Sequence, residues 1–376
     1  MAKVMIFGAG KIARGFLGQL MFLSGTDFAF VEKFESLASL LKERGQYTVN
    51  VLGAPEKNSL VTGFRAYAAS EKEAIAAEMQ DAQVVFTAVG GKNLVDLAPD
   101  IALALQAAGH PINVITCENW KKPAAILKTE IGKLAPRVQA GFAESVVMRS
   151  AIEPTPEQLA QDPLTVNVQN FWRLPVDGDA LIAPLPDIQG IEPMANFQGF
   201  LERKFYTYNA ANGTVSFLGS LYGLTHICES ANDPRVAEVL EKVYLETGEA
   251  LAKKYGISLE EQLAFAATSR MKLRDPVIVD TLERNARDPL RKLGPDDRLV
   301  GSARLAENYG VKPEGLATAI AAAIHYVSPG DPSAEKLADM RSTVGTAGIL
   351  EEICKIRQGE TLFDLVLEKE KELGLA

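Results

Sequence analysis

The chain has 376 residues, of which 47% are hydrophobic and 23% are charged, and its formal net charge is −9. A length of this order predicts two or more domains, because single hydrophobic cores stop growing near about 250–300 residues. The composition excludes disorder, a collagen-like repeat and a coiled coil as descriptions of the whole chain. The acidic balance excludes a general nucleic-acid binder, which would carry a basic field.

Cysteine and histidine are scarce, with three of each, and they are far apart in the sequence. No CxxC, HxxxH or HxH spacing occurs, so we expect no bound metal. The sparse cysteines are typical of a reducing cytoplasm, and the first strand-like run begins at Lys3, too early for a signal peptide. The longest apolar stretch, near Leu316–Val327, is shorter than the ~20 residues of a membrane span. We therefore expect a cytoplasmic protein with no membrane partner.

The N-terminal half alternates between strand and helix patterns. Lys3–Phe7 is a short apolar run, Ile12–Leu23 has helical periodicity, and Phe28–Val31 is a second apolar run. Later segments of the same kinds are the strands Gln83–Ala88 and Asn113–Thr116 and the helix Val95–Ala108. Strands that alternate with helices predict an α/β fold with a doubly wound parallel sheet and helices on both faces.

Beyond a proline- and glycine-containing stretch at Pro184–Pro193, the pattern becomes almost entirely helical. The expected helices are Ala195–Tyr208, Val236–Tyr255, Leu259–Lys272, Gly315–Tyr326 and Thr346–Arg357. We therefore predict a sheet domain over residues 1–190 and a mostly α-helical domain over residues 191–376.

A glycine motif follows the first strand directly. Gly8, Gly10 and Ala13 form a GxGxxA pattern, in which the first glycine permits a tight turn and the second lets the backbone approach a pyrophosphate. Glu32, at the end of the second strand, is placed to accept a hydrogen bond from the ribose 2′-hydroxyl of NAD. Lys33 follows it and could instead meet the extra phosphate of NADP. The alternative is a glycine-rich turn without a ligand.

The strand–turn–helix context favours a Rossmann-type dinucleotide site with NAD as the cofactor. The expected cofactor contacts are Phe7, Gly8, Ala9, Gly10, Lys11, Ile12, Glu32, Ala88, Val89 and Gly90.

A polar segment at residues 202–213, ERKFYTYNAANG, combines a lysine with two asparagines. Lys204 could act as a base if burial or a nearby cation lowers its pKa, and Asn209 and Asn212 could donate hydrogen bonds to a substrate oxygen. On a continuous α-helix, these three positions lie within about 140° of one another. The alternative is a solvated basic patch on a helix that ends at Asn212-Gly213.

Five segments in this order resemble one enzyme family. They are FGAGKIARGFLG from residue 7, TAVGG from residue 87, TCEN from residue 116, ERKFYTYNAANG from residue 202 and DPLRKLGPDDRL from residue 288. Together they are similar to the polyol-specific long-chain dehydrogenases, and the resemblance covers nearly the whole chain. It implies a metal-independent, NAD-linked enzyme that interconverts a sugar alcohol and a ketose.

The resemblance also implies roles for individual residues. A family pattern K-x4-N-x2-H places the base at Lys204 and an asparagine at Asn209. A further family asparagine that polarises the carbinol oxygen falls on Asn119, and a family acid falls, by a loose local match, on Asp177. The chain departs from the pattern at Asn212, where the family has histidine. An asparagine can hydrogen-bond a hydroxyl group but cannot titrate.

A cluster of cations in the segment from residue 287 to residue 298 is a candidate anion site. Arginine suits the paired hydrogen bonds that a phosphate accepts. The alternative is a structural ion-pair network among Arg287, Asp288, Arg291 and Asp297, and sequence alone leaves both open. The resemblance to the phosphate-using branch of the family implies substrate binding by Arg287, Arg291 or Lys292.

The leading functional hypothesis is therefore an NAD-dependent dehydrogenase of the mannitol 1-phosphate/fructose 6-phosphate type, whose partner is a small polyol or sugar phosphate. Two alternatives stay open. One is a hexuronate reductase of the tagaturonate or fructuronate type, with a carboxylate at the cationic cluster. The other is a nucleotide-binding homologue that has lost catalysis. The sequence does not determine the oligomeric state.

Overall fold

The computed structural model describes residues 3–376, which divide into two compact units with the boundary between Phe197 and Gln198. The division falls after Phe197, whereas the sequence pattern placed it after residue 190. The difference arises because residues 191–194 form a strand that pairs with a strand of the first unit.

The first unit contains a six-stranded sheet in the order β5-β2-β1-β6-β7-β8, and all of its pairs are parallel. Its strands are β1 (Lys3–Phe7), β2 (Asp27–Glu32), β5 (Arg65–Ala68), β6 (Ala82–Thr87), β7 (Ile112–Thr116) and β8 (Ala140–Glu144). This is the strand order of the doubly wound dinucleotide-binding fold. The predicted parallel sheet is confirmed.

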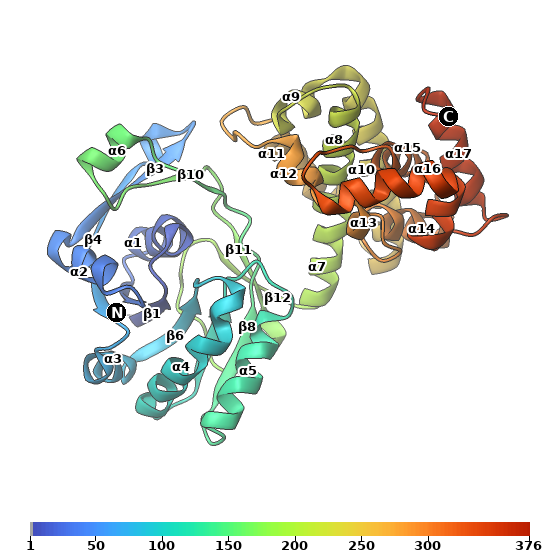
Figure 1. Cartoon of the computed structure of the whole chain (residues 1–376). Helices are drawn as coiled ribbons and strands as arrows, with labels where there is room; N and C mark the ends of the chain where they lie inside the picture. The colour runs from blue at the N-terminus through green and yellow to red at the C-terminus, as the bar shows by residue number, and fades with distance from the viewer. Residues whose placement is uncertain (1–2) are drawn as a thin grey trace. The chain divides into compact units, whose positions relative to one another are not determined.

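Both faces of this sheet are covered. Met5 and Phe7 of β1 pack against the helices on one face, whereas Val4 and Ile6 pack on the other, as the two-residue repeat of a strand requires. The first face carries the helices α3 (Lys72–Met79), α4 (Leu94–Ala108) and α5 (Pro123–Leu134) (Figure 1).

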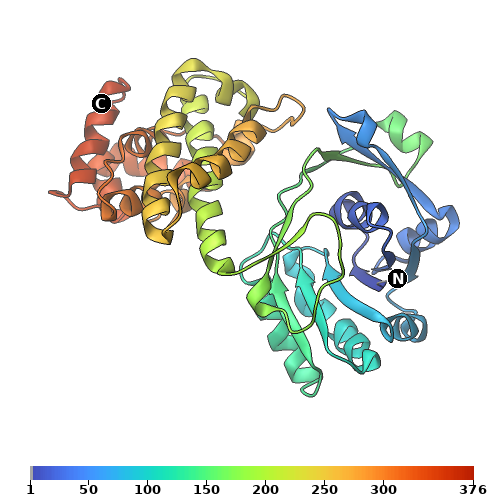
Figure 2. The same ribbon diagram turned by 180° about the vertical axis from the view of Figure 1, so that it is seen from behind.

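The second face differs from the expected layer of helices. It is covered by a helical segment, η1 (Ala13–Gly18, a π-helix) and α1 (Gln19–Leu23), and by a second sheet in the order β4-β3-β10-β9. Figure 2 shows this helical segment, in dark blue, enclosed between the two sheets. The strands of the second sheet are β3 (Gln46–Leu52), β4 (Ser59–Thr62), β9 (Ala151–Ile152) and β10 (Val166–Gln169).

The first unit also contains one further helix that packs beside β5, several short helices and a pair of strands. They are α2 (Glu35–Arg44), η2 (Pro55–Lys57), η3 (Gly91–Asn93), α6 (Pro156–Gln161), η4 (Gly178–Ala180) and the parallel pair β11 (Leu174–Asp177) and β12 (Ile191–Met194).

The rest of the chain is helical, as predicted. Its elements are α7 (Phe197–Lys204), η5 (Phe205–Asn209, a π-helix), α8 (Ala210–Leu221), α9 (Ile227–Asn232), α10 (Pro234–Tyr255), α11 (Leu259–Arg274), α12 (Leu282–Ala286), α13 (Pro289–Lys292), α14 (Val300–Asn308), α15 (Glu314–Ile324), α16 (Pro332–Glu352) and α17 (Thr361–Glu372).

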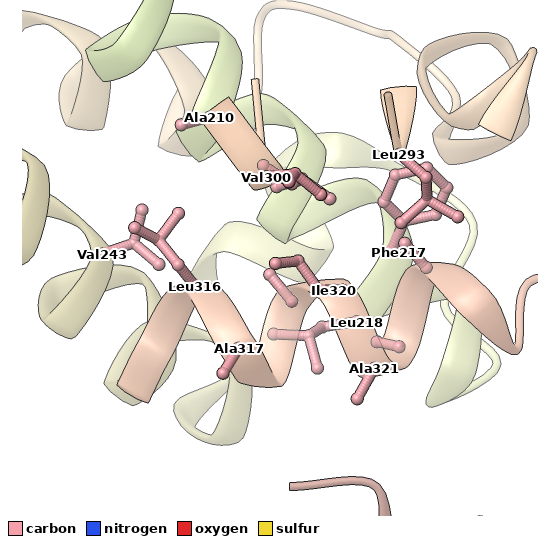
Figure 3. Packing of buried hydrophobic residues seen from close by; sticks show 14 of the residues in the cluster. Ala210, Phe217, Leu218, Val243, Leu293, Val300, Leu316, Ala317, Ile320 and Ala321 are labelled. Carbon is pink, nitrogen blue, oxygen red and sulfur yellow. The ribbon is translucent and has the colours of Figure 1, made fainter. Parts of the chain in front are cut away.

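The helix α15 forms the centre of the second unit. It is rich in alanine, and nearly all of its residues are buried, which is typical of a helix surrounded by others. Figure 3 shows Leu316 of α15 beside Val243 of α10, and Ile320 beside Leu218 of α8. This packing fixes α8, the helix that follows the predicted catalytic lysine.

The helix expected at Thr346–Arg357 is the second half of α16. Gly345 interrupts α16 with a φ of 67° and a ψ of −176°, and a regular helix resumes at Thr346. It ends at Glu352 rather than at Arg357.

Candidate active site

The glycine turn after β1 has the conformation that the motif predicts. Gly8 has a φ of 98°, and a Cβ atom on it would lie 2.6 Å from the carbonyl oxygen of Ala88, so only glycine fits. A Cβ atom on Gly10, by contrast, would meet nothing within 4 Å. Open space therefore lies beside the backbone of Gly10, where the motif places a pyrophosphate.

Glu32 lies at the end of β2 and is buried. Its carboxylate accepts hydrogen bonds from the backbone N–H groups of Ala9, at 2.7 Å, and Phe34, at 3.0 Å. The acid expected to contact a ribose thus also holds the glycine turn in place.

A cavity of about 370 Å³ opens at the carboxyl end of β1 and β2. It is lined by Phe7, Gly8, Gly10, Val31, Glu32, Lys33, Phe34, Leu37, Ala69, Ala88, Val89, Asn93, Asp96, Leu97 and Asp100. Six of the ten expected cofactor residues belong to this lining, and Ala9, Lys11, Ile12 and Gly90 do not. The Lys11 ammonium group forms an ion pair with Glu153 on the surface.

Two charged residues that the sequence analysis did not select hold the turns around this cavity. Arg14, a buried residue of η1, donates hydrogen bonds to the carbonyl oxygens of Ala9 and Leu164. The carboxylate of Glu118 accepts hydrogen bonds from the N–H groups of Val89, at 3.1 Å, and Gly90, at 2.8 Å. Both residues lie inside quoted sequence segments, Arg14 in FGAGKIARGFLG and Glu118 in TCEN, which is the signal that could have identified them.

Asn119 and Asp177 also belong to the first unit. Asn119 is exposed and follows β7. Asp177 ends β11, and an antiparallel bridge between Ser145 and Val176 sets it opposite Glu144. Burial raises the pKa of both acids, and the charge of Asp177 raises that of Glu144 further.

Cys117 lies beside this region, but its environment is unsuited to a nucleophile. Burial raises the pKa of its thiol to about 12, so the thiol stays protonated at neutral pH.

In the second unit, Lys204 and Asn209 are in contact. The Lys204 ammonium group donates a hydrogen bond to the Asn209 side-chain oxygen at 3.2 Å. On a regular α-helix these positions would be about 140° apart, but residues 205–209 form the π-helix η5. The wider π turn brings residues five apart onto one face, which the predicted continuous α-helix could not do.

The surroundings of Lys204 favour its neutral form. Burial lowers its pKa, and the nearby Arg298 guanidinium lowers it further. A second lysine, Lys272 of α11, is affected in a similar way: burial and the charge of Lys204 lower its pKa to about 8. Lys272 lies in no recognisable sequence motif, so the sequence alone gives no signal for it.

The expectation that a helix could end at Asn212-Gly213 is wrong. The helix α8 continues to Leu221 because Gly213 is buried against Arg298 and Leu299, and most of the following residues belong to the core. The Asn212 side chain donates a hydrogen bond to the side-chain oxygen of Asn285 in α12, at 3.1 Å.

The three expected phosphate-binding cations have different surroundings. The Arg291 guanidinium group pairs with Asp288, at 2.8 Å, and with Asp297, at 3.3 Å. Lys292 is buried and donates to the carbonyl oxygens of Asn285 and Arg287. The Arg287 side chain is exposed and has no ion-pair partner among residues 3–376.

Two further properties concern the residues that the structure describes. No group of three or more histidine, cysteine, aspartate or glutamate side chains in residues 3–376 could hold a metal ion. Within the same residues, no helix combines the length and the apolar character needed to cross a membrane.

Comparison with known proteins gives the family. Residues 2–190 match the mannitol dehydrogenase Rossmann domain, and residues 196–368 match the mannitol dehydrogenase C-terminal domain. The chain is 34% identical over 369 residues to the mannitol-1-phosphate 5-dehydrogenase of Bacillus subtilis (strain 168), covering 96% of this chain and 98% of that protein. It is 32% identical over 374 residues to the enzyme of the same name from an Exiguobacterium species, covering 98% and 96% of the two chains.

Solved structures share the fold. A substrate-free D-sorbitol dehydrogenase matches with a TM-score of 0.81 at 15% identity, over 99% of this chain and 93% of the other. The mannitol 2-dehydrogenase of Pseudomonas fluorescens, solved with NAD and D-mannitol, matches with a TM-score of 0.65 at 16% identity, over 99% and 91%.

The chain belongs to the mannitol dehydrogenase family. The predicted resemblance to polyol dehydrogenases, the predicted fold class and the predicted oxidoreductase class are thereby confirmed.

Proposed function

We propose that the protein is an NAD-dependent oxidoreductase that interconverts a sugar-alcohol phosphate and a ketose phosphate, of the mannitol 1-phosphate/fructose 6-phosphate type. The observation that carries the proposal is the contact between Lys204 and Asn209, in surroundings that lower the pKa of the lysine. This pair occurs in a chain that is 34% identical to a mannitol-1-phosphate 5-dehydrogenase over nearly its full length.

The first unit has the features that a dinucleotide needs. Bound NAD would accept the hydride from the alcohol carbon in the oxidative direction. The open space beside Gly10 leaves room for the pyrophosphate, and Glu32 lines the same cavity. A carboxylate there repels the 2′-phosphate of NADP, which favours NAD. Ala88 and Val89 also line the cavity.

In the oxidative direction the substrate loses a hydride and a hydroxyl proton, and Lys204 takes the proton. A neutral amine is required for this step, and burial together with the Arg298 charge favours it. Asn209 holds the Lys204 nitrogen by a hydrogen bond. Asn119 would donate a hydrogen bond to the reacting oxygen and Asp177 would bind a substrate hydroxyl group, roles that rest on the family pattern.

Among the three cations expected to bind the phosphate, Arg287 is the strongest candidate for a direct contact with the phosphate group. Its guanidinium group is exposed, whereas Asp288 and Asp297 already neutralise Arg291. Lys292 is engaged with backbone carbonyl groups and would act by holding this segment in place. We further propose a cytoplasmic location, since a phosphorylated sugar and NADH are available there.

A panel of carbonyl substrates tests the proposal. NADH and NADPH oxidation is measured with fructose 6-phosphate, fructose, fructuronate and tagaturonate. We expect NADH to be preferred and kcat/KM to be at least about tenfold higher with fructose 6-phosphate than with fructose, because charge-assisted hydrogen bonds contribute roughly 1.5–3 kcal/mol. Higher turnover with a hexuronate would change the substrate class, and NADH binding without any turnover would overturn the proposed activity.

A further inference from the structure

The side-chain amide of Asn212 has one fixed orientation. Its nitrogen donates to the Asn285 side-chain oxygen at 3.1 Å, across the contact between α8 and α12. The nitrogen end of the amide is therefore engaged with the protein. The oxygen end has no hydrogen-bond partner among residues 3–376, and Asn212 is only half-buried.

Asn285 cannot easily reverse its own amide. Its side-chain nitrogen donates to the carbonyl oxygen of Thr281 at 2.9 Å, and the Asp280 carboxylate also accepts a hydrogen bond from the Asn285 side chain. Reversing the amide would turn an oxygen toward both acceptors and break both interactions. Its backbone is held as well, because the Lys292 ammonium group donates to the Asn285 carbonyl oxygen at 2.6 Å. Asn285 therefore presents its side-chain oxygen to Asn212, and the Asn212 side-chain nitrogen must donate the hydrogen bond between them.

This arrangement leaves the Asn212 side chain with a hydrogen-bond acceptor, its carbonyl oxygen, that is not engaged by the described residues. Asn212 lies three residues after Asn209 on the same helical face, one turn beyond the contact with Lys204. Its free carbonyl oxygen can only accept a hydrogen bond, whereas an imidazole could donate or accept and could gain a charge. The group that matches a neutral acceptor is a hydroxyl donor on the substrate.

We propose that Asn285 is a specificity-determining positioning residue, which fixes Asn212 as a hydrogen-bond acceptor for one hydroxyl group of the substrate. The inference rests on the proposed function, because it requires that a polyhydroxylated substrate binds beside Lys204.

The test compares wild type with Asn285→Ala, using the best carbonyl substrate of the panel and analogues that each lack one hydroxyl group. Wild type is expected to disfavour one deoxy analogue by about tenfold or more in kcat/KM, because a lost neutral hydrogen bond costs roughly 1.5 kcal/mol. In Asn285→Ala the Asn212 amide can turn, so this preference should fall below about threefold. The change should appear mainly in KM, since the Lys204–Asn209 contact is untouched.

Two variants separate positioning from folding. Asn285→Asp keeps an acceptor for the Asn212 nitrogen and should retain the preference, with lower thermal stability because the donor to Thr281 and Asp280 is lost. Glu283→Ala alters an exposed residue of the same short helix that takes no part in the Asp280–Asn285 contact, and should leave the preference unchanged. Thermal unfolding of each variant shows whether the protein is still folded.

Calorimetric binding of the same compounds keeps this inference distinct from the proposed function. Turnover or binding with an unchanged preference in Asn285→Ala would overturn the inference alone. Binding without turnover, with the preference lost in Asn285→Ala, would support the inference and overturn the proposed activity. Neither binding nor turnover with any compound would overturn both.

Discussion

At the residue scale, the proposed activity depends on Lys204, whose surroundings favour the neutral amine that a base requires. An ammonium group on a surface would stay protonated at neutral pH. Burial of Lys204 penalises the charged form, Arg298 repels it, and Asn209 orients the nitrogen. Burial, the Arg298 charge and the Asn209 hydrogen bond therefore all act on the Lys204 side-chain nitrogen. For this reason we assign the proton transfer to Lys204.

The contribution of Arg298 can be measured by its removal. In Arg298→Met the pKa of Lys204 should rise, because a nearby positive charge is lost. Since alcohol oxidation needs the neutral amine, the acidic limb of the kcat/KM profile for polyol oxidation should move to higher pH. Arg298→Lys keeps the charge and should keep the limb near its wild-type position. An acidic limb that does not move in Arg298→Met would show that another group titrates.

The sequence predicted only part of the site at this scale. Lys204 and Asn209 were selected because they form a local pattern within one segment. Asn285 is 73 residues from Asn212 and has no pattern of its own, so its contact depends on how α12 packs against α8. The family pattern indicated Asn119 and not its neighbour Glu118, although the Glu118 carboxylate holds the loop at Val89 and Gly90.

At the element scale, the two π-helical segments lie at the two predicted sites. The segment η1 follows the glycine turn, and η5 separates Lys204 from Asn209. A π turn contains one more residue than an α turn, so it alters which side chains share a face. Hydrophobic periodicity is too coarse to locate one extra residue, and the sequence therefore predicted continuous α-helices at both places.

The turn between β1 and η1 allows a paired test of the cofactor site. Gly8→Ala should lower stability by roughly 1–3 kcal/mol and weaken NADH binding, because its φ is 98° and a Cβ atom would approach the Ala88 carbonyl oxygen. Gly10→Ala should leave stability unchanged, since its Cβ atom would meet nothing. It should nevertheless weaken NADH binding by about tenfold or more, through a clash with the pyrophosphate.

Thermal unfolding and NADH fluorescence titration measure the two effects separately. If Gly10→Ala bound NADH as tightly as wild type, the pyrophosphate would not lie beside Gly10.

A second element-scale test concerns the junction of α10 and α15. Glu246 of α10 is buried and accepts hydrogen bonds from the first N–H groups of α15, at Gly315 and Leu316. Burial raises its pKa to about 7 despite these bonds. The folded-state pKa of Glu246 is above its unfolded value, so the protonated carboxyl group stabilises the fold. This contribution to the free energy of unfolding is fully present below about pH 4.5 and is lost as the pH rises through 7. The total loss is up to about 3 kcal/mol.

Glu246→Gln removes this titration. The free energy of unfolding of wild type relative to the variant should therefore fall between pH 5 and pH 8, in denaturant titrations at each pH. The variant also loses one hydrogen bond to α15, which adds a constant offset. A difference between the two proteins that does not change with pH would contradict the predicted titration.

At the scale of the whole molecule, the sequence pattern predicted the class of both units. The strands β1, β2, β6 and β7 were recognised because both of their faces are buried, which makes them continuous apolar runs. The second sheet was missed because its strands come from distant segments, such as β3 and β10, whose pairing no local pattern reveals. Short helices such as α12 and α13 were missed because they contain too few residues to show a period.

In the proposed function, each unit has a separate role. The first unit carries the cavity at Gly8, Gly10 and Glu32, and the second carries Lys204 with the groups that tune it. Loss of the base should therefore affect chemistry without affecting cofactor binding.

The most direct test of this central claim is to measure turnover and NADH affinity together in full-length Lys204→Met. We expect kcat with fructose 6-phosphate to fall by at least about 100-fold, as is typical when a general acid–base group is removed, while the Kd for NADH changes by less than about twofold. Lys336→Met, at an exposed lysine of α16, should match wild type in both measurements. A Lys204→Met protein that retains wild-type turnover would contradict the account.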